Sequence, residues 1–133
     1  HLSIRRQRQM CIRDRGWAVY LKKWNGTSWV EIGGSASGTG IDKGITSSLE
    51  IDESGNPIVL YTSYTCGEAD YCVYLKKWNG EGWVEIRSSA SGYGIALGIA
   101  GGIVFDPFET IWVVYMSPVP PYSLTDIFVR KDP

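Results

Sequence analysis

Histidine is nearly absent from this chain of 133 residues, in which His1 is the only one. Without histidine in the body of the chain, neither a Ser-His-Asp triad nor a histidine-based metal site can be assembled. Long apolar runs are also missing, and none approaches the roughly 20 residues that cross a bilayer. We therefore expect no catalytic residues, no metal, no cofactor and no membrane span.

Basic residues are scarce outside the first fifteen positions, which hold five of the thirteen lysines and arginines. These positions contribute a net charge of +4 to a total of −1, so the rest of the chain carries −5. An acidic body argues against nucleic acid as a partner. Residues 1–15 could be a basic arm that binds nucleic acid, but residues 5–15 closely resemble translated sequencing-adapter read-through. We accordingly treat residues 1–15 as an artefactual or disordered segment.

An internal repeat is the main positive feature of the chain. Residues 19–41 and 73–95 share the pattern V-Y-L-K-K-W-N-G-x-x-W-V-E-I-x-x-S-A-S-G-x-G-I, so that residue n matches residue n + 54. The same offset continues without a gap into the C-terminal part, where Ile51-Asp52 corresponds to Phe105-Asp106. A repeat of this length is usually one supersecondary unit that buries its apolar faces against its neighbours.

Each repeat contains four runs with the composition of β-strands. In the complete copy the second run, 58–64, is apolar without polar alternation, as expected for a strand covered on both faces. Asn79-Gly80 and its counterpart Asn25-Gly26 predict hairpins with type I′ turns. The glycines of 92–102 argue against a helix there. The expected strands are 17–24, 29–32, 47–52, 58–64, 71–78, 83–86, 102–106, 111–117 and 127–131.

Four antiparallel strands per unit predict an all-β fold, specifically a partial β-propeller. The expected units are a half blade at 16–41, a full blade at 42–95 and a partial blade at 96–133, so the propeller would be incomplete at both ends. A β-sandwich built from the same hairpins is the structural alternative. Open blade edges would favour self-association.

The repeat pattern, together with L-x-I-D-x-x-G-N-P-x-V-x-Y at 49–61, resembles blades of secreted bacterial β-propeller proteins of the sialidase-like and lectin-like kind. The resemblance covers residues 16–133 and implies a secreted or cell-surface location. Sialidase-like propellers carry an aspartate-and-glycine turn near the place of Asp52 and Gly55. The spacing here departs from that pattern, and Glu109 stands where the third copy would have glycine.

Aromatic residues are the main candidates for ligand binding. Trp24 and Trp29, and in the next copy Trp78 and Trp83, flank the two Asn-Gly turns. Such pairs can stack on sugar rings, although a tryptophan pair across a hairpin is first of all a packing device. Each pair is preceded by two lysines, of which one should lay its stem over the tryptophan. The candidate ligand-binding set is Trp24, Trp29, Trp78, Trp83, Lys23 and Lys77.

Cys66 and Cys72 bracket the loop before the third strand, and we expect them to form a disulfide, which fits an extracellular protein. The recurring Glu31 and Glu85 are expected to be exposed. Asp52, like Asp106 in the next copy, is expected to close its own turn.

These features favour a non-catalytic binding or scaffolding module of a secreted repeat protein, with carbohydrate or protein as partner. The first alternative is a fragment of a sialidase-like or glycosidase-like propeller whose catalytic residues lie outside this chain. In that class several arginines hold the substrate carboxylate, whereas only Arg87 and Arg130 remain after residue 15. The second alternative is a short-repeat protein that closes a ring by homo-oligomerisation.

Overall fold

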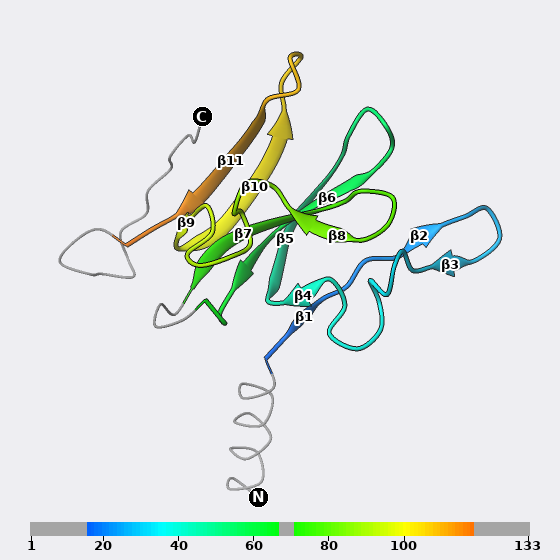
Figure 1. Cartoon of the computed structure of the whole chain (residues 1–133), viewed down its shortest axis with the longest axis horizontal. Helices are drawn as coiled ribbons and strands as arrows, with labels where there is room; N and C mark the ends of the chain where they lie inside the picture. The colour runs from blue at the N-terminus through cyan, green and yellow to red at the C-terminus, as the bar shows by residue number, and fades with distance from the viewer. Residues whose placement is uncertain (1–15, 67–70, 119–133) are drawn as a thin grey trace, which may run out of the picture.

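The structure is a computed structural model that describes residues 16–66 and 71–118. The predicted all-β class is confirmed, because these residues contain eleven strands and no helix (Figure 1). The predicted strand at 127–131 lies outside the described residues. The strands are β1 (Ala18–Val19), β2 (Lys23–Trp24), β3 (Trp29–Val30), β4 (Asp42–Lys43), β5 (Ile45–Ile51), β6 (Pro57–Ser63), β7 (Cys72–Trp78), β8 (Trp83–Glu85), β9 (Ala96–Leu97), β10 (Ile99–Phe105) and β11 (Ile111–Met116).

The four strands predicted for the complete repeat form one antiparallel sheet in the order β5-β6-β7-β8. The short strand β9 pairs with the first half of β7, on the edge that β8 uses further along. The chain between β8 and β9 therefore makes a loop beside one edge of β7. Within the described residues no sheet closes on itself.

The copies on either side repeat this arrangement in smaller sheets. In the first copy β2 pairs with β3 and β1 pairs with β4, in registers that match β7-β8 and β7-β9 at the repeat offset. In the third copy β10 pairs with β11 as β5 does with β6. Both of these pairs have an irregularity at the same repeat position, Ser47 or Gly101, and the Ser47 hydroxyl donates to the Gly101 carbonyl.

Several predicted boundaries were wrong. The first-copy strand expected at 17–24 is two short strands, β1 and β2, because the described residues provide no partner equivalent to β6 along its other edge. The strands β5 and β10 begin before their predicted starts, and β4 and β9 were not predicted. Two-residue strands carry no usable periodicity, so alternation of side chains cannot reveal them.

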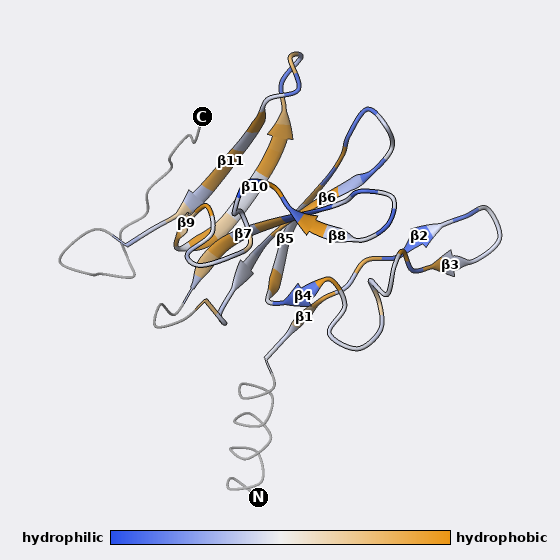
Figure 2. Ribbon diagram, viewed as in Figure 1, coloured by the Kyte–Doolittle hydropathy of each residue, from blue (hydrophilic) through white to orange (hydrophobic). Residues whose placement is uncertain are grey.

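The hydrophobic core consists of two clusters, one on each face of the middle sheet. On one face, Ile58 and Leu60 pack against residues of β10 and β11 such as Ile103. On the other face, Val59 and Tyr61 belong to a cluster with residues of the first copy, including Val19. All seven residues of β6 are buried. The prediction that this strand is covered on both faces is confirmed, and apolar residues also line the neighbouring β10 (Figure 2).

Candidate functional site

The tryptophan hairpins have the same geometry in both copies. The ring centroids of Trp24 and Trp29 are 5.6 Å apart and tilted by 59°, and those of Trp78 and Trp83 are 5.7 Å apart and tilted by 56°. Each pair lies directly opposite across its strand ladder. The structure thus gives both pairs the cross-strand packing role expected from the sequence.

The turn between these tryptophans differs from the predicted type I′ turn. In the middle copy Gly80 has a positive φ of 98°, but Asn79 is not among the residues with positive φ. Instead, the Asn79 side-chain oxygen accepts hydrogen bonds from the backbone N–H groups of Glu81 and Gly82, each at 2.8 Å. A side chain that bonds backbone two and three residues ahead can build a wider turn without positive φ at the asparagine.

Exposure distinguishes the two tryptophan pairs. Trp24 is 49% exposed and Trp29 is 63% exposed. Trp78 and Trp83 are half-buried, because they pack on the first copy. The Trp83 indole N–H donates to the Ile32 carbonyl at 2.9 Å. Only the first pair therefore presents an open aromatic surface among the four tryptophans predicted to bind a ligand.

The two lysines of the predicted ligand-binding set do not lie on the same face as the tryptophans next to them. Successive residues of a strand point to opposite faces, so Lys77 lies on the opposite face of the sheet from Trp78. Lys77 Nζ is 3.0 Å from Asp52 Oδ2, beside the third copy. Lys23 is exposed in the first copy. The structure accordingly divides the predicted ligand-binding set between two faces.

Cys66 and Cys72 form a disulfide, with their Cα atoms 6.3 Å apart. Both residues are buried in the cluster between the first and middle copies. The bond joins the segment that follows β6 to the first residue of β7. It thereby fixes the chain at the end of the sheet opposite the tryptophan hairpin.

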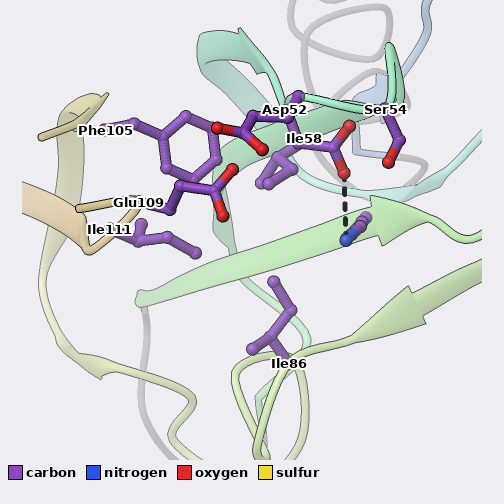
Figure 3. Close-up of a pocket in the computed structure, with 9 residues that line it drawn as sticks. Asp52, Ser54, Ile58, Ile86, Phe105, Glu109 and Ile111 are labelled. Carbon is purple, nitrogen blue, oxygen red and sulfur yellow. Dashed lines mark ion pairs between the residues drawn. The ribbon is translucent and has the colours of Figure 1, made fainter. Parts of the chain in front are cut away.

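A pocket of about 410 Å³ lies between the β5-β6 turn and the β10-β11 turn (Figure 3). Its apolar lining includes Phe105 and Ile111 from the third copy and Ile58 from the middle copy. Its polar lining comprises Asp52, Glu53, Ser54, Lys77 and Glu109. The pocket was not predicted from the sequence, because turns of two successive repeats form it.

The carboxylates of the pocket have different environments. Asp52 accepts the Asn56 backbone N–H at 2.8 Å, and this bond together with Lys77 lowers the pKa of Asp52. Glu109 has its pKa raised, mainly by a hydrogen bond with Glu53. The like charges of Glu53 and Asp52 nearby raise the pKa of Glu109 further, because they disfavour its ionised form.

Glu109 is a pocket residue that differs from the repeat pattern in a way the sequence makes visible. It occupies the repeat position of Gly55, and both residues have positive φ, 63° for Glu109 and 84° for Gly55. A non-glycine residue in this conformation is uncommon. The sequence shows that Glu109 replaces a glycine of the repeat. It does not show that the Glu109 side chain lies beside the turn of the preceding repeat.

The turn-closing role predicted for the aspartates is confirmed. Asp52 bonds Asn56, while Asp106 accepts the backbone N–H groups of Phe108 and Thr110 at 2.8 and 3.0 Å. Asp106 also accepts the Trp112 indole N–H at 2.9 Å. This bond and those to the backbone lower the pKa of Asp106.

Glu31 and Glu85 are exposed, as predicted. Each accepts a hydrogen bond at 2.9 Å from a serine of the following connection, Ser37 or Ser91. This pairing occurs identically in the two copies. It assigns the recurring glutamates a structural contact within the loop that follows the fourth strand.

A pair of buried serines was not recognised as important in the sequence. The Ser89 hydroxyl donates to the Leu75 carbonyl at 2.7 Å and accepts the Ile86 N–H at 2.8 Å. Ser35 makes the equivalent bonds in the first copy. The sequence signal is the recurring S-A-S tripeptide, whose first serine ties the loop to the third strand.

Comparison of the chain with known protein families, curated proteins and solved structures finds no match. Within 16–66 and 71–118, no three His, Cys, Asp or Glu residues are grouped to hold a metal ion. The same residues include no helix able to cross a membrane.

Proposed function

We propose that the chain is a scaffolding and binding module of the β-propeller type, in which blade-like sheets stack face to face. The observation that carries this proposal is the burial of the middle sheet on both faces. Residues of one parity along β6 contact the third copy, and residues of the other parity contact the first copy. Consecutive repeats that share cores in this way are characteristic of propellers and other repeat architectures.

The outer face of the third copy supports further stacking. Leu60 of β6 is 0% exposed, whereas Val114, at the same repeat position in β11, is 39% exposed. Val104 and Met116 are exposed as well. An apolar strand face of this kind fits another blade, supplied either by the same chain or by a second copy.

Secretion to the extracellular space or the bacterial cell surface is part of this proposal. The Cys66-Cys72 disulfide supports it, because disulfides form and persist mainly in oxidising compartments.

Duplication of the middle repeat tests the scaffolding proposal. A second copy of residues 42–95 inserted after Ile95 keeps the native repeat spacing at both junctions. If repeats stabilise one another through shared faces, the longer protein should unfold cooperatively at a higher urea concentration. An unchanged midpoint, or a separate transition for the inserted unit, would contradict stacking if it persists when residues 87 and 88 of the first duplicate are changed to glycine, the residue present at 33 and 34.

Carbohydrate binding at Trp24 and Trp29 is the second candidate function. The observation in its favour is the exposure of both rings at a hairpin end. Titration with soluble oligosaccharides, followed by tryptophan fluorescence, should show saturable binding that Trp29→Ala abolishes and Trp83→Phe retains. Equal binding by the Trp29→Ala variant would remove this candidate.

A further inference from the structure

The corner that follows the fourth strand has the same backbone form in two copies but different residues. We define the corner as residues 32–34 in the first copy and residues 86–88 in the middle copy. Gly33 and Gly34 have φ values of 57° and 74°, and Arg87 and Ser88 have 49° and 63°. The corner conformation therefore does not require glycine, since arginine and serine adopt it in the same chain.

Contact with the next repeat distinguishes the two corners. A Cβ atom at Gly33 would lie 2.2 Å from Cζ3 and 2.5 Å from Cη2 of Trp78. These distances are too short for any side chain to coexist with the Trp78 ring in its present position. The ring has little freedom to move, because Trp83 lies beside it and is itself hydrogen-bonded to Ile32.

We propose that the first corner glycine is a specificity-determining residue of the interface between repeats: glycine admits a following repeat with a tryptophan at the end of its third strand, and arginine excludes it. This inference rests on the proposed stacking of repeats and deepens it by naming the partner. A Gly33-type corner accepts a Trp78-type neighbour, whereas the Arg87 corner accepts only a repeat with another residue at that position.

The sequence of the third copy agrees with this rule. The repeat offset places Asp132, which lies outside the described residues, at the position of Trp78. The chain thus combines glycine with a following tryptophan once and arginine with a following aspartate once. Both members of the pair change together from one junction to the next.

Exchange of the corner residue tests the rule within the native chain. Gly33→Arg introduces the residue that the middle copy holds at this position, so the backbone form is compatible with it. Gly38→Arg is the matched control, because Gly38 has φ 59° and a Cβ added there would meet no atom within 4 Å. We expect Gly33→Arg to lower the folding equilibrium constant about tenfold more than Gly38→Arg, an effect typical of overpacking.

A second substitution identifies the cause of that difference. In a Trp78→Ala background, Gly33→Arg and Gly38→Arg should lower the folding equilibrium constant by similar factors, because the clashing ring is gone. Each constant is measured by urea unfolding monitored by circular dichroism. Equal effects of the two arginines in the native background, or an unequal effect that persists without Trp78, would overturn the inference.

The duplicated chain separates failure of this inference from failure of the scaffolding proposal. In that chain the Arg87 corner of the first duplicate faces Trp78 of the second. Arg87→Gly with Ser88→Gly in the first duplicate should raise the folding equilibrium constant about tenfold more than the same pair of substitutions does in the native chain. Equal gains would refute the corner rule, whereas a duplicate that never stacks with either corner would refute the scaffold itself.

Discussion

The first and middle copies share the sequence V-Y-L-K-K-W-N-G but fold it to different extents. In the middle copy its first six residues lie in β7, a continuous strand of seven residues, whereas in the first copy they contribute only to β1 and β2, of two residues each. Both copies retain the same loop bonds, such as Leu21 N–H to Ser35 and Leu75 N–H to Ser89. The difference lies in β6, which pairs with β7 from Cys72 to Lys77 and has no counterpart beside β1 and β2 among the described residues.

Strand length in these two regions is decided by a partner and not by local preference. Identical residues have identical intrinsic propensities, so the longer strand must owe its continuity to the ladder and packing that β6 provides. Substitutions that weaken β6, or that remove features found in only one copy, should therefore change the difference in strand length and stability between the first and middle copies.

Leu60→Ala should have the largest effect, because Leu60 is 0% exposed and packs between β6 and the third copy. Its loss should destabilise the protein by about 2–5 kcal/mol, the range for a buried leucine replaced by alanine. Hydrogen exchange should accelerate in β7, which would then resemble its first-copy counterpart.

The matched control for this change is Leu49→Ala in β5, where the side chain is 50% exposed. That substitution should lower the free energy of unfolding by less than about 1 kcal/mol. Similar losses for the two leucines in urea unfolding would show that β6 does not carry the core of the middle sheet.

Replacement of both Cys66 and Cys72 by alanine should have the second largest effect. The first copy already has alanine at the position of Cys72, namely Ala18, so the change makes the two copies more alike. Loss of a disulfide that closes a loop this short should lower the free energy of unfolding by about 2 kcal/mol. Reductant should reproduce the loss in the native protein, and a reductant-insensitive midpoint would contradict the expectation.

Trp83→Ala should destabilise more than Trp29→Ala. Both lose a cross-strand aromatic contact worth about 0.2–1 kcal/mol, but Trp83 also loses its hydrogen bond to Ile32. The total for Trp83 should be about 1–2 kcal/mol when a typical hydrogen bond is added. Trp83→Phe, which keeps an aromatic ring without the N–H, should fall between the two in a denaturant series. Equal losses for the two alanine variants would contradict the difference in packing.

The smallest effect is expected at the turn aspartates. Asp52→Asn removes a carboxylate whose pKa is lowered in the folded protein by Asn56 and Lys77. Such a group stabilises the fold above its unfolded pKa, about 3.9, and this contribution disappears as the pH falls through the lower folded pKa. Unfolding of the Asp52→Asn variant should therefore depend less on pH below about 4.

Salt should separate Asp52 from its third-copy counterpart Asp106. The penalty for Asp52→Asn should shrink in about 1 M NaCl, because the charge of Lys77 is screened. The penalty for Asp106→Asn should change less, since Asp106 bonds the neutral indole of Trp112. Parallel salt dependence in the two variants would indicate that the Asp52-Lys77 contact adds nothing measurable to stability.

The all-β class and the longer strands of the middle copy were predictable because the repeat is gapless. A single offset indicated the four strands β5 to β8 of the middle sheet, and the unbroken apolar run of β6 indicated its burial. The short strands β4 and β9 were not predicted, because two residues cannot show periodicity and their pairing depends on β1 and β7. The continuous first-copy strand was overpredicted, because its sequence matches that of β7 but the described residues provide no partner like β6.

The candidate sites were less predictable, because they depend on which face meets which neighbour. Trp78 and Lys77 are adjacent candidates in the sequence, but pleating sends them to opposite faces of the sheet. The pocket arises from Glu109 and the turn of the preceding repeat, a contact that no local pattern specifies. Gly33 resembles an ordinary loop glycine in the sequence, and only the position of Trp78 against it reveals its role.

Successive residues of β6 pack against different neighbouring copies, and this also limits how such a chain can change in length. Deletion of a single residue within the strand would exchange the two sets of side chains, so that each would face the wrong neighbour. Both cores would be lost together, although only one residue had been removed. Insertions and deletions in this part of the gene should therefore survive as whole repeats of the coding sequence, or as changes confined to the loops.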